Sequence, residues 1–286
     1  MALAITLAPP LGVFAVAHPV FAYGYLWPGG GWIALVVLSL AACWVAGRLA
    51  SARLIAQLSL VAAVLAASAM NSAELSPARG TDKLRSVNTS WPHGPLSASN
   101  RVDRITRVGR VTRELDKLGV TWIVFPESAI YPTPGLEYLL SLEVDQRRAA
   151  TVWLGMAQGE PGSVSMPMLG ILEAQGGIRL LPARQPVPLA PGSWTAAAWT
   201  QPAQIPSPVG PAYVSICYED LIPGLFLLSV AAEGRPSIVV SMANSAFLKP
   251  DAVASQAWRI ESLSRLFGLP LLRAVNLPPS PQAAAR

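Results

Sequence analysis

Two apolar segments of this chain each end at a side chain that could take part in acyl transfer. Residues 212–220 (AYVSICYED) contain Cys217, the only cysteine outside the hydrophobic N-terminal part, and Glu219 follows two positions later. Residues 120–127 (VTWIVFPE) form a second apolar run, which ends at Glu127. Both runs are rich in β-branched and aromatic residues and predict buried strands. A thiol and a carboxylate at two strand ends can meet at one sheet edge, which favours a thiol-based acyl-transfer enzyme.

Cys217 needs a base or an electropositive setting, because only the thiolate is a strong nucleophile. His18 lies in the hydrophobic N-terminal part and His93 in a segment rich in proline and glycine, so a cysteine–histidine pair is not expected. Glu127 is the best-placed base, since an apolar setting raises the pKa of a carboxylate toward neutrality. Two other interpretations stay open: Glu127 as a carboxylate that caps or salt-bridges a strand end, and Cys217 as an inert buried thiol.

The remaining composition restricts the chemistry further. The two histidines and two cysteines form no cluster with metal-ligand spacing, so neither a metal nor another cofactor is expected. Cys43 and Cys217 lie in different parts of the chain, which argues against a disulfide. The net charge of +5 is concentrated between Arg79 and Arg113, where a solvated helix face is expected and contact with anionic lipid headgroups is the alternative. No nucleic-acid motif accompanies this charge, and no direct nucleic-acid partner is expected.

The first 70 residues have the composition of a membrane segment, with Arg48 and Arg53 as their only charged side chains. Residues 32–47 and 54–70 predict membrane helices, somewhat shorter than the roughly 20 residues that span a bilayer. A third candidate, 3–26, is interrupted by prolines. The two arginines fall in one short loop, which predicts a cytoplasmic loop, a bacterial inner-membrane location and a periplasmic globular domain. The predicted divisions are 1–71 for the membrane part, 72–82 for a linker and 83–286 for the domain.

The rest of the chain alternates between strand and helix patterns. Val102, Ile105, Val108, Val111, Leu115 and Leu118 recur every three or four positions and predict the apolar face of one helix. Further helices are expected over 138–150, 225–232 and 252–267. Strands are expected over 83–90, 120–125, 151–155, 213–217 and 237–242, with a hairpin over 169–173 and 178–181 and a proline-rich loop over 182–211. These patterns predict an α/β domain with a mixed sheet.

Three motifs resemble those of the nitrilase (carbon–nitrogen hydrolase) superfamily, in the same order and at similar separations: residues 125–130 (FPESAI), 216–219 (ICYE) and 243–247 (ANSAF). Residues 217–219 (CYE) together with the hydrophobic N-terminal part resemble the branch of the apolipoprotein N-acyltransferases. Residues 9–13, 183–188 and 271–276 are similar to nitrilase-like conjugal transfer proteins. The resemblance covers about residues 80–276 and the general form of the N-terminal part. It implies an α-β-β-α sandwich domain preceded by two or three transmembrane helices.

The resemblance also implies a glutamate, a lysine and a cysteine as the catalytic set. Glu127 would then deprotonate Cys217, which attacks an amide or ester carbonyl to give a thioester. In the lysine's register this chain has Arg184, which can donate to an oxyanion but never serves as a neutral amine. Lys249, in a loop, is expected to be solvated.

The same resemblance assigns supporting residues. Tyr218 would supply a backbone N–H for the oxyanion and shape the pocket, and Glu219 would be an orienting group. Asn244 matches a position near the pocket, with a turn-forming role as the alternative.

Two functions follow from these expectations. The first is a membrane-anchored amidase or acyltransferase of conjugal plasmid transfer. The second is a catalytically inactive assembly or structural factor of the conjugation machinery, favoured by Arg184 and by the short segment after Asn276. The expected partners are membrane lipids, proteins of the conjugation apparatus and a second copy of the chain as a homodimer.

Overall fold

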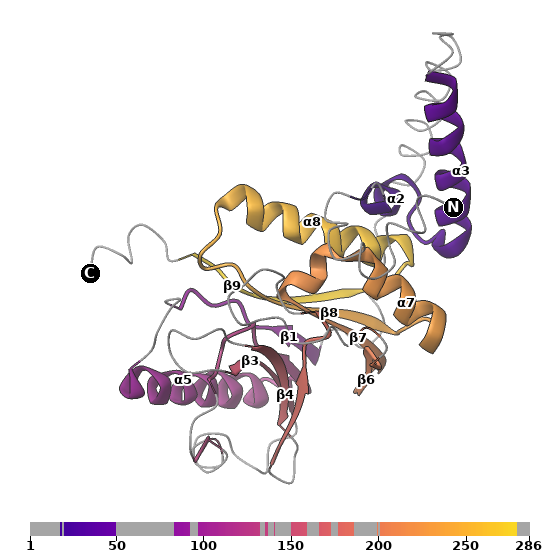
Figure 1. Ribbon diagram of the computed structural model, residues 1–286. Coiled ribbons are helices and arrows are strands. Elements are labelled where there is room, and N and C mark those ends of the chain that lie inside the picture. Colours follow the sequence, from indigo (N-terminus) through magenta and orange to yellow (C-terminus); the bar gives the residue numbers. More distant parts are fainter. Residues whose placement is uncertain are drawn as a thin grey trace.

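The computed structural model describes residues 18, 20–49, 83–91, 97–131, 135, 136, 140, 150–158, 166–172, 177–185, 199 and 201–278. Its strands form two sheets in which the strand order follows the chain (Figure 1). The first sheet consists of β1 (Leu84–Ser86), β2 (Trp122–Val124), β3 (Thr151–Gln158), β4 (Met166–Leu172) and β5 (Ile178–Pro182). The second consists of β6 (Gln204–Ser207), β7 (Gly210–Ile216), β8 (Ile238–Asn244) and β9 (Leu271–Asn276).

Each sheet combines parallel and antiparallel pairs. β1, β2 and β3 run parallel, β4 pairs antiparallel with β3, and β5 pairs antiparallel with β4. β6 and β7 form an antiparallel pair, and β7, β8 and β9 run parallel. The β4–β5 pair confirms the predicted hairpin. The residue patterns alone predicted one mixed sheet, and the presence of two is a correction to that expectation.

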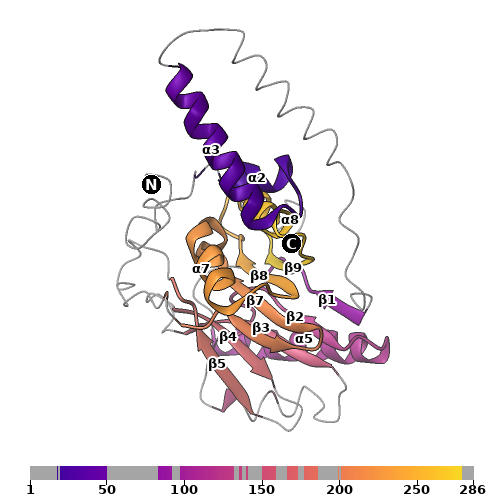
Figure 2. The same ribbon diagram turned by 90° about the vertical axis from the view of Figure 1, so that its right-hand side faces the viewer.

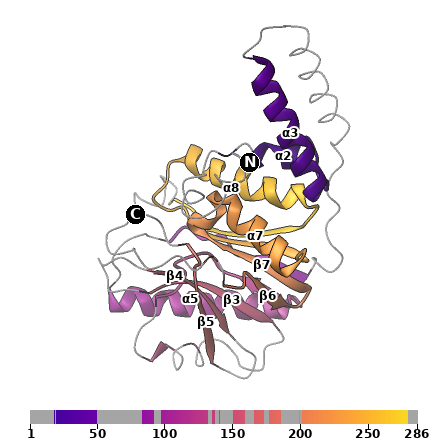
Figure 3. The ribbon, with the colours of Figure 1, turned by 45° about the vertical axis from the view of Figure 1, so that its right-hand side comes forward.

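The two sheets face each other, and helices cover the outer face of each (Figure 3). α5 (Ala98–Lys117) packs on the first sheet, whereas α7 (Pro223–Glu233) and α8 (Pro250–Leu266) pack on the second. A third apolar core fills the space between the sheets, where Trp122 and Trp153 meet edge to face with ring centroids 4.5 Å apart. This four-layer order is the α-β-β-α sandwich that the resemblance implies.

β6 lies inside the segment 182–211 that was predicted to be a loop, and that prediction is wrong for these four residues. The prolines in this segment conceal the strand, because Pro206 sits within it opposite Pro211 of β7. Ile205 is buried against the inter-sheet core, which gives the short strand its apolar anchor. The helix expected over 138–150 falls almost wholly outside the described residues.

α5 begins at the N-cap Ser97, whose hydroxyl accepts from the Asn100 N–H at 3.2 Å. Ile105 and Val108 are buried against the first sheet, as their spacing predicts. Val102 and Leu118 are exposed, and their assignment to the apolar face is wrong because they lie near the two ends of the helix, outside the apolar core on the first sheet. Arg104 is buried, so the expectation of a solvated basic face fails at this residue.

The N-terminal part of the chain is attached to the sandwich through α2 (Val20–Leu26), which packs on α8. Gly24 permits this contact, since a Cβ there would lie 1.8 Å from the Ser262 carbonyl oxygen. The Ser262 hydroxyl donates to the Phe21 carbonyl, and the rings of Tyr25 and Trp258 stack at 5.5 Å. The two helices are therefore held in close contact.

α3 (Gly31–Leu49) rises away from the sheets (Figures 1 and 2). It contains the predicted helix 32–47 and exposes a row of large apolar side chains: Trp32, Ile33, Val36, Val37, Leu40 and Trp44. Within the described residues no single helix is both long and apolar enough to cross a bilayer, although Val20–Leu26 and Gly31–Trp44 meet the requirement as a pair bent by 114°. The predicted helix 54–70 and the linker 72–82 lie outside the described residues.

Candidate active site

The predicted nucleophile and base meet where β2, β7 and β8 end. Glu127 follows β2 by three residues, Cys217 directly follows β7, and Asn244 is the last residue of β8. Because β7 and β8 are parallel neighbours, their carboxyl ends lie at the same edge of the second sheet. Glu127 reaches this edge from the facing sheet, so the site is assembled across the interface of the two sheets.

The Glu127 carboxyl forms hydrogen bonds with the Cys217 thiol and the Asn244 backbone N–H, the latter at 3.1 Å from Oε2. Glu127 is 8% exposed, and burial raises its pKa to about 7 although both hydrogen bonds act in the opposite direction. Burial and the neighbouring Glu127 raise the pKa of Cys217 well above its ordinary value. Near neutral pH the thiol therefore carries its proton beside a carboxyl that is close to half-ionised, which suits proton transfer between them.

Glu127 and Cys217 both lie in turns with unusual backbone geometry. Cys217 has a φ of 52°, and Ser128, directly after Glu127, has a φ of 60°. Residues other than glycine rarely adopt such values. The Gln256 side-chain amide donates to the Cys217 carbonyl at 2.9 Å, and Arg104 donates to the Ser128 carbonyl at 2.6 Å. These two side chains hold the carbonyls of the two left-handed residues in place, and strain of this kind is often found at functional sites.

Gly155 of β3 makes room for the Glu127 turn. A Cβ at this position would lie 2.5 Å from the Glu127 Cα and 2.3 Å from the Pro126 carbonyl oxygen. The Ala129 N–H donates to the Gly155 carbonyl at 2.9 Å, which fixes the turn on β3. The position of Glu127 therefore depends on a glycine that lies 28 residues further along the chain.

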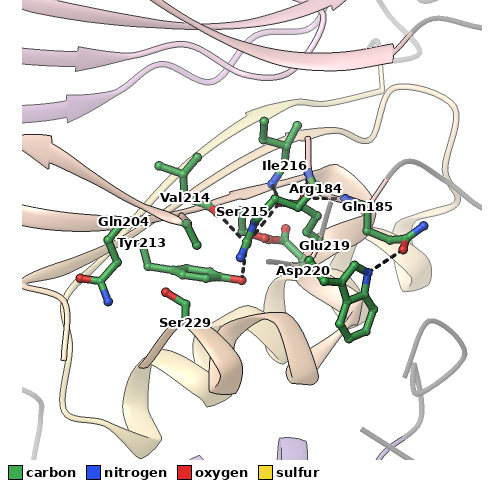
Figure 4. A network of polar contacts seen from close by, with 12 residues as sticks. Arg184, Gln185, Gln204, Tyr213, Val214, Ser215, Ile216, Glu219, Asp220 and Ser229 are labelled. Carbon is green, nitrogen blue, oxygen red and sulfur yellow. Dashed lines mark hydrogen bonds and ion pairs between the residues drawn. The ribbon is translucent and has the colours of Figure 1, made fainter. Parts of the chain in front are cut away.

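Arg184, predicted to occupy the place of a catalytic lysine, belongs to a different cluster (Figure 4). Its guanidinium donates to the Tyr213 hydroxyl at 3.0 Å and to the Val214 carbonyl at 3.3 Å, and forms an ion pair with Glu219 at 3.7 Å. Burial opposes the charge of Arg184, but Tyr213 and Glu219 outweigh it and raise the pKa of the guanidinium above its ordinary value.

Glu219 joins the turn that carries Cys217, called the nucleophile turn below for its predicted role, to the segment after β5. Its carboxylate accepts from the backbone N–H groups of Arg184 and Gln185, and from that of Ile216 at 3.0 Å. This carboxylate therefore orients backbone as well as the guanidinium. Tyr218 is half-buried beside Trp199 and Ile222, where it borders the nucleophile turn. Lys249 is exposed at the N-cap of α8, in agreement with its predicted solvation.

Sequence reasoning missed Asp220, a fully buried carboxylate next to Glu219. It accepts from the hydroxyls of Ser215 at 2.6 Å and Ser241 at 2.8 Å, and burial raises its pKa to about 6. The two serines stand opposite each other on β7 and β8. Polar residues within two apolar strand runs were the available signal for this network.

A cavity of about 50 Å³ opens between the two sheets beside the Arg184 cluster, with room for a few water molecules. Arg184 and Glu219 form part of its wall together with apolar side chains such as Leu181 and Val214. Among the residues that the structure describes, no group of three His, Cys, Asp or Glu side chains is arranged to hold a metal ion.

The chain is similar to known proteins in sequence and in structure. No family model matches the chain. Over 294 residues it is 28% identical to a protein named Probable conjugal transfer protein TraB, from Sinorhizobium fredii (strain NBRC 101917 / NGR234), an alignment that covers 96% of this chain and 71% of that protein.

Two solved structures also resemble it. The carbon–nitrogen hydrolase from Helicobacter pylori G27 has a TM-score of 0.47 at 12% identity, covering 67% of this chain and 72% of that one. A variant of the Nesterenkonia AN1 amidase from the nitrilase superfamily has a TM-score of 0.46 at 15% identity, covering 67% and 74%. The chain is thus similar along most of its length to a conjugal transfer protein, and the solved structures that resemble it include enzymes of the nitrilase superfamily.

Proposed function

We propose that this protein is a cysteine-dependent acyl-transfer enzyme that works at a membrane in conjugal plasmid transfer. The observation that carries the proposal is the hydrogen-bonded pair of Glu127 and Cys217 at a strained strand end. A buried carboxyl with a pKa of about 7 is a suitable general base for a neighbouring thiol, and a capping or salt-bridging carboxylate has no need of that contact.

The reaction follows from these two groups. Glu127 takes the proton of Cys217 as the sulfur attacks the carbonyl carbon of an amide or ester. The tetrahedral intermediate then collapses, the carbon–nitrogen or carbon–oxygen bond breaks, and the leaving group takes the proton from Glu127. Water or an acceptor amine then attacks the thioester and passes its proton to Glu127. The carbon–sulfur bond breaks, the acyl product leaves, and Cys217 takes the proton back from Glu127. The Tyr218 N–H is the proposed donor to the oxyanion.

Alkylation of Cys217 by iodoacetamide across a range of pH tests this proposal in detergent-solubilised protein. The experiment uses a Cys43→Ser background, because Cys43 is an exposed thiol that would also be labelled. Labelling that rises with the ionisation of Glu127 and falls about 100-fold in Glu127→Gln supports a base-assisted thiol. Slow labelling that is indifferent to Glu127→Gln contradicts the proposal, and Cys217→Ala identifies the labelled position. A thioester trapped on Cys217 by an amide or ester substrate would extend the support from the thiol to the reaction.

Attachment to the membrane is part of the same proposal. It is supported by the exposed apolar side chains of α3 and by the composition of the first 70 residues. Arg48 and Arg53 favour a periplasmic domain of an inner-membrane protein. Lysine substitution at Ile33 and Leu40 should release more protein from vesicles, whereas Leu118→Lys, at a similarly exposed apolar site that caps the C-terminus of α5, should not. Alkaline phosphatase fused after the domain should be active if the domain is exported.

The second candidate is a non-catalytic assembly factor of the conjugation machinery. The specific observation in its favour is the commitment of Arg184 to Glu219 and Tyr213, which directs the expected oxyanion donor into a structural cluster. The plasmid transfer frequency of donor cells that carry Cys217→Ala separates the two candidates. Loss of transfer with normal protein levels supports the enzyme, and unchanged transfer supports the assembly factor.

A further inference from the structure

Asn276, at the end of β9, makes four hydrogen bonds and is 2% exposed. Its Oδ1 accepts from the Thr89 hydroxyl and from the Trp91 N–H, both at 2.8 Å. Its Nδ2 donates to the Trp91 carbonyl at 3.1 Å and to Asn244 Oδ1 at 3.0 Å. An asparagine side chain offers two donor hydrogens and two acceptor lone pairs, so this amide is fully used.

The bond to Asn244 connects this junction to the reacting atoms. Asn244 Oδ1 also accepts from the Ala246 N–H at 3.3 Å, so its side chain is held on two sides. These bonds hold Asn244 at the end of β8, where its backbone N–H donates to Glu127 Oε2 at 3.1 Å. Burial and Glu127 raise the pKa of the Cys217 thiol, whereas a hydrogen bond from this same Asn244 N–H lowers it.

We propose that the Asn244 backbone N–H is a catalytic donor shared by Glu127 and Cys217, and that Asn276 is the positioning residue that directs it. The proposal rests on the acyl-transfer function above. When the S–H bond breaks and the proton moves to Glu127, the negative charge moves from a carboxylate oxygen to the sulfur. A donor within reach of both atoms stabilises the charge at either position, so it favours the ionised pair throughout the transfer.

The electrostatic surroundings make such a donor valuable. The charged groups that influence Glu127 and Cys217 besides each other are the carboxyls of Asp220 and Glu219, which raise the pKa of Glu127 further. Arg184, the cation predicted for this site, is paired with Glu219. A neutral N–H stabilises the ionised pair without adding another buried charge, which would carry a large desolvation cost.

A purely structural role for Asn276 is the competing explanation, since it also joins β9 to the segment after β1. Thr89→Val is the matched control, because it removes one hydrogen bond from the same Asn276 amide and leaves the bond to Asn244. Asn276→Ala removes all four hydrogen bonds of this amide, including the one to Asn244. If Asn276 serves stability alone, the two variants differ only in how far they destabilise the fold.

The experiment measures the pH profile of Cys217 alkylation in the full chain with Cys43→Ser, together with the midpoint of urea unfolding. We expect Asn276→Ala to shift the profile upward by about one pH unit, which lowers labelling near neutral pH about 10-fold. Thr89→Val should lower the unfolding midpoint and leave the profile in place. An Asn276→Ala profile that coincides with that of Thr89→Val would overturn the positioning role.

A second substitution covers the case in which Asn276→Ala does not fold. Replacement of Asn244 by its α-hydroxy analogue turns the N–H into an ester oxygen and keeps the side chain that Asn276 holds. The same upward shift is expected, and an unchanged profile would overturn the role of the N–H. Failure of the acyl-transfer function gives a different result, because the parent protein itself would then label slowly and without regard to Glu127→Gln.

Discussion

Two buried polar clusters contact the nucleophile turn, and they differ in whether their groups titrate near neutral pH. In one, Glu127 is hydrogen-bonded to Cys217 and to a backbone N–H. In the other, Arg184 and Glu219 form an ion pair, and the Glu219 carboxylate also accepts from backbone N–H groups. The first cluster contains a carboxyl whose pKa lies near neutrality, whereas the second contains a guanidinium that stays charged.

The two clusters differ in how their groups respond to pH. Burial brings the pKa of Glu127 to about 7, so this group responds to neutral pH. Tyr213 and Glu219 outweigh burial at Arg184 and raise its pKa, so the guanidinium stays charged. The ion pair of Arg184 and Glu219 holds the backbone beside Cys217, and Glu127 and Cys217 are left to exchange a proton.

The largest effect should come from breaking the ion pair. Glu219→Gln removes the negative charge and leaves the Arg184 guanidinium buried without its partner, which should lower the free energy of unfolding by about 3–5 kcal/mol. Tyr213→Phe is the control, since it removes a single hydrogen bond from Arg184 and should cost about 1 kcal/mol. Urea unfolding measures both, and similar small losses in the two variants would show that the ion pair does not hold this turn.

The pH dependence of stability should identify the titrating cluster. The folded-state pKa of Glu127 is raised from 4.5 to about 7, so between these values the folded protein holds a proton that the unfolded chain has released. Stability from this group is therefore present below pH 4.5 and declines as pH rises to about 7, by roughly 3 kcal/mol. The difference between the unfolding free energies of the parent and Glu127→Gln, measured from pH 4 to 8, should follow this decline.

Asp220→Asn serves as the comparison for that measurement. Burial raises the pKa of Asp220 from 3.8 to about 6, so its contribution has the same sign but is lost over a lower and narrower range of pH. A difference curve for Glu127→Gln that is flat between pH 5 and 7 would contradict the assignment of the titrating group.

The sequence predicted one cluster better than the other, for a physical reason. Glu127 and Cys217 end two strongly apolar runs, and strand ends on facing sheets have little freedom in where they arrive. Arg184 follows β5 in the register of a lysine, but its side chain is turned by Glu219, which lies just after β7 of the other sheet. No local pattern reports a contact of that kind.

The supporting residues were hidden in the same way. Arg104 was grouped with the solvated basic residues of α5, yet the Ser128 carbonyl lies within its reach. Gln256 lies on α8 at a position where a polar residue ordinarily faces water, and instead it bonds to the Cys217 carbonyl. Asn276 ends a recognisable motif, but three of its four side-chain hydrogen bonds join it to Thr89 and Trp91, some 185 residues away. Most of the described elements and the meeting of Glu127 with Cys217 were predictable, and the residues that hold this pair were not.

An alanine at Gly155 should disturb the titrating cluster and leave the ion pair alone. The added Cβ would meet the backbone of Pro126 and Glu127, which cannot yield as a flexible side chain can, so a loss of about 1–3 kcal/mol is expected. Because Glu127 is displaced, labelling of Cys217 near neutral pH should fall as well. Gly170→Ala on β4 is the control, since its Cβ would clash with the flexible end of Met156 and make only an ordinary contact with Ile178. Equal labelling in the two variants would contradict the dependence of Glu127 on Gly155.

The smallest effect concerns the strain in the turn after Glu127. Ser128 has a φ of 60°, which costs a residue with a Cβ about 1–2 kcal/mol, and Ser128→Gly removes that cost. Glycine also loses more backbone freedom on folding, by about 0.5–1 kcal/mol, so the net gain in stability should be below about 1 kcal/mol. Ser128→Ala keeps the Cβ and the strain, and it should show no gain. Because Arg104 holds the Ser128 carbonyl in both variants, labelling of Cys217 should stay within about 2-fold of the parent even as stability changes. A large loss of labelling in Ser128→Gly would mean that the strain itself, and not only the bonds around it, keeps Glu127 against the thiol.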